Sequence, residues 1–201
     1  IRNHAIIYLF MCILLLTGII FGAVIVNSMN FIQKQDLFFY LERFFNFIVN
    51  EDTSDRFSIW KDSFVYHLRF LALFFLLGLS VIGLPIIWVL LFIKGLVVGF
   101  SVGFMVNQLG MEGLMFASLS IAPHNLLIIP IYLFAGTLAM IFAIFGMRKI
   151  FTRKSADSLL QPFFNYLVIF SFLILLAGVA SFIEAYVSTS TMEALIKSLY
   201  L

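Results

Sequence analysis

The chain has 201 residues, of which 63% are hydrophobic and only 11% are Asp, Glu, Lys or Arg. A soluble domain of this size has about 45–50% apolar and about 25% charged residues, so this excess cannot be buried in one globular core. The net charge of +2 is too small to indicate nucleic-acid binding. The composition predicts an all-α, polytopic integral membrane protein with one membrane domain over residues 1–201.

The first predicted span covers residues 5–26, long enough to cross a hydrocarbon core of about 30 Å. Gly18 and Gly22 are four residues apart, a spacing that lets membrane helices approach closely. The single cysteine, Cys12, lies in this run and excludes an intramolecular disulfide. No Cys or His spacing typical of a metal site occurs, so we expect neither a metal nor another cofactor.

Residues 31–49 are amphipathic rather than uniformly apolar. On a helical wheel Phe38, Leu41 and Phe45 lie on one side, and the opposite arc holds Gln35, Asp36, Glu42, Arg43, Asn46 and Asn50. This pattern predicts a helix in the membrane surface or a helix that docks on a partner protein. Phe38, Leu41 and Phe45 are therefore the candidate docking residues.

The second and third predicted spans cover residues 63–83 and 86–106. A tight turn at Gly83-Leu84-Pro85 joins them, so the two spans must form an antiparallel hairpin. Three glycines repeat along one face of the third span: Gly95, Gly99 and Gly103. Close packing against another helix is the favoured interpretation of these glycines.

Residues 113–122 are apolar but too few to cross a membrane, which predicts a re-entrant or an interfacial segment. Pro123 is predicted to end this segment. The fourth span covers residues 124–147 with a kink at Pro130, and the fifth covers residues 163–183.

The orientation follows from the basic residues. Four cations come directly after the fourth span: Arg148, Lys149, Arg153 and Lys154. Because cytoplasmic loops are enriched in Lys and Arg, this end is predicted to be cytoplasmic. The N-terminus is then cytoplasmic, and the loop over residues 27–62 and the C-terminus are extracytoplasmic.

Three ionisable residues lie in or at the edge of predicted spans: Lys94, His124 and Glu184. A charge at bilayer depth is costly and normally faces the bundle interior. Lys94 is interpreted as an ion or substrate contact, as a lysine bonded to backbone carbonyls freed near the glycines, or as one whose side chain extends to the membrane surface. His124 is interpreted as a proton-linked switch, as a ligand contact, or as a histidine that bonds the backbone groups left unpaired at Pro123. Glu184 is either solvated or paired, and the predicted topology places it near His124.

No catalytic constellation is present, whether a zinc-protease H-E-x-x-H, a G-x-S-x-G elbow or a phosphate-binding loop, so we expect no enzyme. A small-solute or lipid transporter or channel, built around Lys94 and a helix broken at Pro123, is the alternative. Polar side chains across the predicted bundle are sparse for such a path.

The chain resembles the stage II sporulation protein M family of bacterial membrane proteins over essentially its whole length. The resemblance rests on the glycine-rich third span, on Ala122-Pro123-His124-Asn125 with Pro130, and on residues 183–187. The wider family tends to show Pro-His-Gly-x-x-Glu-x-Pro. Here Asn125 replaces the glycine and Ile128 the glutamate, so no role of that glutamate can be carried over.

The resemblance implies a scaffold. It implies a multi-pass protein of the septal membrane that acts in engulfment during sporulation. Such a protein recruits and holds two cell-wall hydrolases, stage II sporulation proteins D and P. Membrane lipids are the other expected partners, nucleic acid is not expected, and the sequence leaves homo-oligomer formation open.

Overall fold

The computed structural model of the chain describes residues 5–50, 56–152 and 160–200. The elements in these ranges are all helical, in agreement with the predicted all-α class. In chain order they are α1 (Ala5–Ser28), α2 (Phe31–Asn50), α3 (Arg56–Gly78), α4 (Gly83–Phe116), η2 (Ala117–Ile121), α5 (Ala122–Thr152), α6 (Leu160–Ile183), η3 (Glu184–Ser188) and α7 (Thr189–Tyr200). The two η elements are π-helices.

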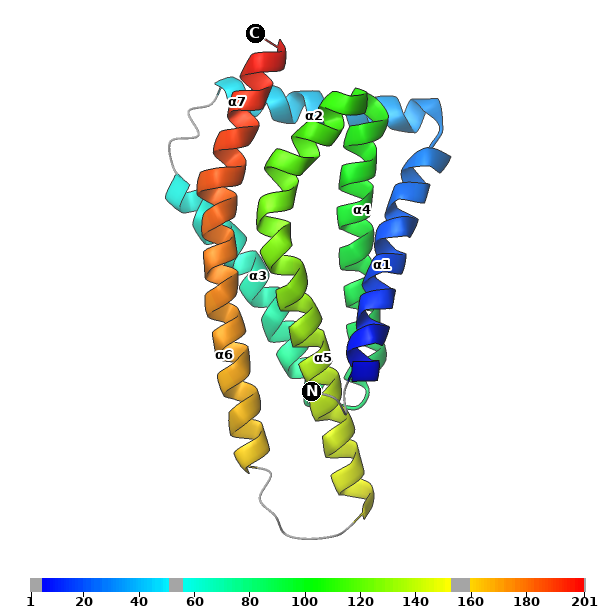
Figure 1. The fold of residues 1–201 in the computed structure, drawn as a ribbon, viewed down its shortest axis with the longest axis vertical. Coiled ribbons are helices and arrows are strands. Elements are labelled where there is room, and N and C mark those ends of the chain that lie inside the picture. Colours follow the sequence, from blue (N-terminus) through cyan, green and yellow to red (C-terminus); the bar gives the residue numbers. More distant parts are fainter. Residues whose placement is uncertain (1–4, 51–55, 153–159, 201) are drawn as a thin grey trace.

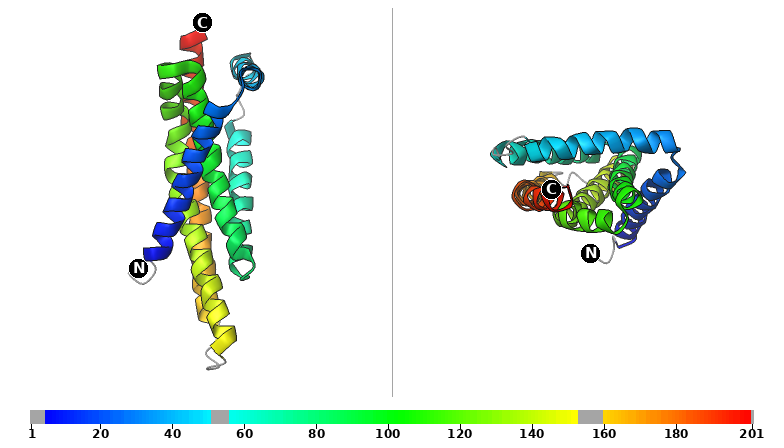
Figure 2. Two further views of the ribbon diagram at one scale, coloured as in Figure 1. Left: turned by 90° about the vertical axis from the view of Figure 1, so that its right-hand side faces the viewer. Right: turned by 90° about the horizontal axis from the view of Figure 1, so that it is seen from above.

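The helices α1, α3, α4, α5 and α6 form an elongated bundle, and α2 lies across one end of it (Figure 1). The C-terminal α7 continues the line of α6 toward that same end. At the opposite end, α5 and α6 extend beyond the α3–α4 turn (Figure 2). The largest core cluster joins all five bundle helices, with fully buried Met11, Phe74, Leu91, Ala135 and Ala177 as examples.

The surface of the bundle is apolar. Among the described residues, three stretches are long and apolar enough to cross a membrane: Ala5–Ser28, Gly83–Lys149 and Leu160–Lys197. Their outward side chains include Ile20, 62% exposed, and Leu175, 70% exposed. Extended apolar surfaces of this kind suit lipid rather than water. The structure thus agrees with the membrane class that the composition predicts.

Glycines bring α1 and α4 into backbone contact. A Cβ atom on Gly95 would lie 2.3 Å from the carbonyl oxygen of Leu15, and one on Gly99 would lie 2.0 Å from that of Ile19. Gly18 and Gly22 face the backbone of α4 in the same way. No side chain larger than hydrogen fits between the helices at these positions, which is the small-residue packing of membrane helices.

The chain reverses direction at Gly110, inside the segment assigned to α4 (Figure 1). Gly110 has φ 59° and ψ −128°, a conformation that side chains with a Cβ atom rarely adopt. Residues 113–122 follow this reversal and lead directly into α5. They form the helical turns that follow the reversal and run back along the bundle into α5. They are not the separate re-entrant or interfacial segment predicted from the sequence.

The prediction that Pro123 breaks the helix is wrong. Pro123 is the second residue of α5 and follows η2 without interruption. A membrane helix can continue through a proline where a local π-helical turn re-satisfies the backbone groups that the proline leaves unpaired. Just before it, the Ala122 N–H donates to the Ala117 carbonyl oxygen, which is the wider i to i−5 bond of a π-helix. α5 also continues through Pro130.

A similar continuation follows α6. The fifth predicted span ends at residue 183, but the helix continues through η3 and α7 (Figure 1). Glu184 therefore lies inside the continuous helical segment formed by α6, η3 and α7, and not at the end of a helix.

Candidate functional site

Polar side chains from α3, α4, α5 and η3 converge on an open cleft of about 600 Å³ between these helices. Apolar residues such as Val97, Ile121 and Ile128 complete its walls. The polar residues of this cleft are Asp62, Ser63, Tyr66, His67, Lys94, Ser101, His124, Asn125 and Glu184. The three ionisable residues selected from the sequence (Lys94, His124 and Glu184) are all among them. We call this site the polar cleft.

Glu184 is held by α3. The Ser63 hydroxyl donates a hydrogen bond to Glu184 Oε2 at 2.5 Å, and His67 Nε2 lies 3.6 Å from the same oxygen. A carboxylate within a membrane bundle is costly unless it has such partners. Two residues that the sequence analysis did not connect with Glu184 therefore supply its direct contacts.

His67 links this pair to α5. Its side chain is only 5% exposed, and its Nδ1 lies 2.6 Å from the hydroxyl oxygen of the fully buried Tyr132. A neutral imidazole has one donor and one acceptor nitrogen. With the Tyr132 O–H donating to Nδ1, the Nε2–H of His67 points at Glu184. The resulting chain from Ser63 through Glu184 and His67 to Tyr132 joins α3, η3 and α5.

Lys94 is held by aromatic side chains. Its Nζ donates to the Tyr66 hydroxyl at 2.7 Å and lies 4.4 Å from the centre of that ring. The ring centres of Phe70 and Tyr132 are each 5.0 Å away. Cation–π contacts of this kind stabilise an ammonium group by about 0.5–2 kcal/mol. The partners of Lys94 are thus aromatic, not the backbone carbonyls near the glycines that one interpretation proposed.

His124 and Asn125 secure the join between η2 and α5. The Asn125 side-chain amide donates to the Ile121 carbonyl oxygen at 2.8 Å, and its nitrogen lies 3.1 Å from His124 Nε2. The second ring nitrogen, His124 Nδ1, is buried and has no hydrogen-bond partner among the described residues. His124 lines the same cleft as Glu184, but its bonded neighbour is Asn125.

Both π-helices border the polar cleft. η2 contributes Ile121 and η3 begins with Glu184. The Glu184 carbonyl oxygen accepts two hydrogen bonds from Thr189, one from its backbone N–H and one from its hydroxyl at 2.9 Å. π-Helices make up well under 1% of residues in proteins and occur frequently at functional sites. Two of them beside one cleft mark it as the candidate site.

The remaining residues selected from the sequence lie elsewhere. Gly95, Gly99 and Gly103 face α1 and not the cleft. Pro123 and Pro130 belong to α5, the helix that carries His124. Ile128, at the position of the family glutamate, lines the cleft and is 2% exposed. His67 could have been noticed as a histidine inside an apolar run, whereas nothing in the sequence pairs it with Glu184.

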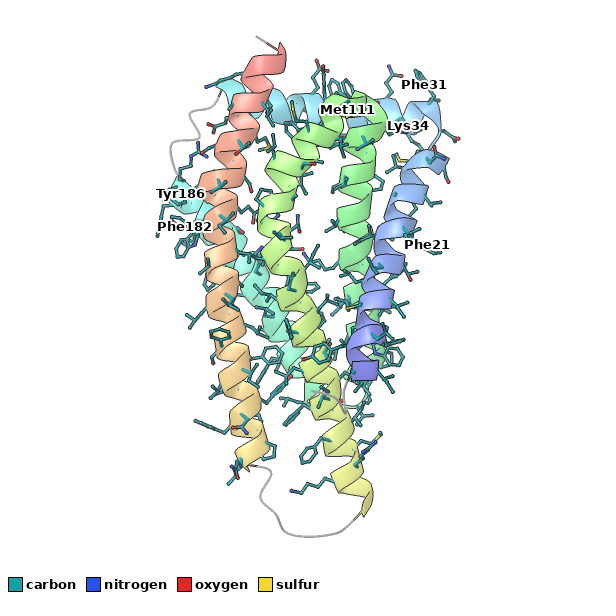
Figure 3. The ribbon with its side chains drawn as sticks, in the orientation of Figure 1. Phe21, Phe31, Lys34, Met111, Phe182 and Tyr186 are labelled. Atoms are coloured by element: carbon teal, nitrogen blue, oxygen red, sulfur yellow. The ribbon has the colours of Figure 1, made fainter. Side chains whose placement is uncertain are left out.

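The docking candidates on α2 do not share one exposed face. Leu41 packs against buried Phe116 and Ile196, which fastens α2 to the end of the bundle. Phe38 is half-buried, and the side chain of Phe45 lies outside the described residues. Over residues 31–43, whose side chains the structure describes, the exposed large apolar residues of α2 are instead Phe31, Ile32, Phe39 and Tyr40. Figure 3 shows Phe31 and Lys34 near the beginning of this helix.

Within the described part of the chain, no group of three or more His, Cys, Asp or Glu side chains could hold a metal ion. The Ser63 hydroxyl donates to Glu184 and so ties this carboxylate to α3. The polar cleft is therefore built from hydrogen bonds and cation–π contacts between helices.

The fold and the polar cleft define an all-helical membrane protein with a polar site between its helices. The sequence profile of the family described as stage II sporulation protein M matches residues 11–189, which include every residue of the polar cleft. The chain belongs to this family and is a sporulation-related membrane protein. Neither the curated protein sequences nor the solved structures contain a significant match.

Proposed function

We propose that the protein is a non-enzymatic membrane scaffold. It recruits and localises peptidoglycan hydrolases, stage II sporulation proteins D and P, for remodelling of the septal wall during engulfment. Membership of the sporulation family over residues 11–189 supports a role in this process. The described residues form one helical bundle with α2 across its end, and the proposal assigns the wall chemistry to the partners.

The proposed topology has five spans, α1, α3, α4, α5 and α6. Successive helices run in opposite directions along the bundle (Figure 1). Arg148 and Lys149 lie near the end of α5, and this basic end is assigned to the cytoplasm. The N-terminus is then cytoplasmic, while α2 and α7 lie on the extracytoplasmic side, where wall hydrolases act.

The proposal depends mainly on the residues exposed on the outer face of α2. On this face Ile32 and Phe39 are 71% and 57% exposed, with Asp36 and Arg43 beside them. The Arg43 guanidinium lies 6.0 Å from the centre of the Phe39 ring. Protein interfaces are enriched in aromatic residues and Arg, whereas charged groups on the same face would oppose burial in hydrocarbon. We therefore assign the outer face of α2 to a protein partner.

Co-purification from sporulating cells tests this assignment. The double substitution Ile32→Ser with Phe39→Ser removes the exposed apolar anchors but leaves Leu41 on the bundle. Each buried apolar side chain contributes roughly 1.5–3 kcal/mol, so the loss of two should reduce hydrolase recovery by tenfold or more. Gln35→Ala, at an exposed polar position on the same helix, is the matched control and should recover the wild-type amount. Equal recovery with the double variant would rule out this face as the docking surface.

A further inference from the structure

A second cleft lies between the ends of α5 and α6 that extend away from α2, and it shares no residue with the polar cleft. Its volume is about 540 Å³. Its walls are apolar, with Leu138, Ile141 and Ile144 from α5, Ile169 from α6 and Ile7 from α1. Neither the proposed scaffold surface nor the hydrogen-bonded network uses this cleft. We call it the α5–α6 groove.

The two ends of the groove differ in polarity. Leu138 and Ile169 line it toward the middle of the bundle, whereas Arg148 lies with Pro162 and Asn165 at the end nearest the α5–α6 connection. At a rise of 1.5 Å per residue, the α-helix from position 138 to position 148 is about 15 Å long. The groove is thus lined by apolar side chains along its length, and the Arg148 cation and the Asn165 side-chain amide lie at one end.

The surroundings of the groove are apolar as well. Phe145 and Phe164 are exposed near its mouth, and Leu167 and Val168 are exposed farther along α6. In a membrane the groove therefore opens toward acyl chains, while Arg148 lies near the end of α5. Lys149, in the last turn of α5, adds a second positive charge next to Arg148.

We propose that the α5–α6 groove binds an anionic phospholipid, with the phosphate at Arg148 and one acyl chain along the apolar strip. The guanidinium group binds phosphate oxygens with two parallel hydrogen bonds, which a neutral polar residue cannot do. Basic sites between membrane helices on the cytoplasmic side recognise anionic lipid headgroups. The order of groups along the groove, cation at the mouth and apolar walls inside, is that of a phospholipid entering from the membrane surface.

Lipid retention by the purified protein tests the proposal. Protein in detergent is incubated with phosphatidylglycerol or phosphatidylcholine, and bound lipid is counted by native mass spectrometry alongside thermal stability. We expect one phosphatidylglycerol to be retained in preference to phosphatidylcholine and to raise the melting temperature. Arg148→Gln should weaken retention about five- to tenfold, the usual contribution of one Lys or Arg at an anionic surface, and Arg148→Lys should retain part of it.

Two further variants separate the groove from general surface charge. Ile141→Trp fills the apolar strip without changing any charge and should also reduce retention. Lys61→Gln removes an exposed cation of α3 that lines neither cleft and should leave retention unchanged. Equal retention of the two lipids, or undiminished retention by both Arg148→Gln and Ile141→Trp, would overturn the proposal. Release of the lipid by glycerol phosphate alone would identify a simple anion site and would overturn it as well.

Discussion

At the scale of residues, the polar cleft shows how one bundle accommodates several ionisable groups. Glu184 is bonded by Ser63 and lies near His67, and Lys94 is surrounded by aromatic rings. Each group would be costly alone in an apolar interior, and each partner lowers that cost. The cleft therefore stabilises the association of α3, α4, α5 and η3.

We predict that His67 and Glu184 contribute to stability as a unit. His67→Ala and Glu184→Gln should each lower the melting temperature in detergent, because the first removes the partner of Tyr132 and the second replaces the carboxylate that faces His67 with a neutral amide. In a double-mutant cycle their coupling should be about 0.5–2 kcal/mol, the range found for polar pairs between membrane helices. His124 and Glu184 interact electrostatically across the cleft, but the hydrogen-bond neighbour of His124 is Asn125, so the pair His124→Ala with Glu184→Gln should couple less. Additive effects of His67→Ala and Glu184→Gln would contradict this account.

Tyr132 gives a second residue-scale prediction. Tyr132→Phe removes only the hydroxyl that lies 2.6 Å from His67 Nδ1 and keeps the ring near Lys94. The buried imidazole then loses a partner, so stability should fall by about 1–3 kcal/mol. Thermal unfolding measures the change. Tyr8→Phe, which alters a tyrosine of α1 outside both clefts, is the control and should have little effect.

At the scale of elements, the contact between α1 and α4 depends on the absence of side chains. Gly99→Ala places a Cβ atom 2.0 Å from the Ile19 carbonyl oxygen, and the two helices must separate to accept it. Overpacking of this kind costs about 1–3 kcal/mol. Gly146→Ala is the matched control, because a Cβ atom there would have nothing within 4 Å. Thermal unfolding should show a lower melting temperature for Gly99→Ala and an unchanged or higher one for Gly146→Ala, which gains helix propensity. Equal melting temperatures would show that the helices adjust freely.

The reversal at Gly110 depends on backbone conformation and not on close contact with another helix. A Cβ atom on Gly110 would have nothing within 4 Å, so Gly110→Ala introduces no clash with another residue. Its φ of 59° with ψ of −128° still disfavours any residue other than glycine, at a cost of about 1–3 kcal/mol. Reduced thermal stability of Gly110→Ala, with Gly146→Ala again as the control, is the expected outcome. A fully stable variant would indicate that the reversal adopts another conformation.

At the scale of the whole molecule, the proposed orientation determines which surfaces can meet wall hydrolases. With Cys12 replaced by serine, Gln35→Cys on α2 should react with a membrane-impermeant thiol reagent on intact cells. Gln161→Cys, near the start of α6, should react only after the membrane is permeabilised. Both positions are exposed, so the difference reports the side of the membrane rather than burial. Labelling of Gln161→Cys on intact cells would reverse the orientation and remove the assignment of α2 to extracytoplasmic partners.

The sequence by itself determined the membrane class, the helical content and the identity of three ionisable residues of the cleft. These properties follow from local composition, since an apolar run of sufficient length partitions into a membrane whatever its neighbours are. The glycine spacing in residues 5–26 and 86–106 also indicated close packing, because a repeat of four residues stays on one helix face. The family resemblance rested on similarly local motifs.

Only the tertiary structure decided which helix faces meet. Ser63 bonds Glu184 from 121 positions away in the chain, and no local pattern in either segment predicts that pairing. The sequence placed a helix break at Pro123, whereas the chain reverses at Gly110 and passes Pro123 in a continuous helix. A local π-helical turn lets a helix continue through a proline, whereas a positive φ favours glycine, so the position of the turn depended on backbone conformation. Helical periodicity placed Leu41 among the docking residues. Periodicity alone does not show that Leu41 already packs against the end of the bundle.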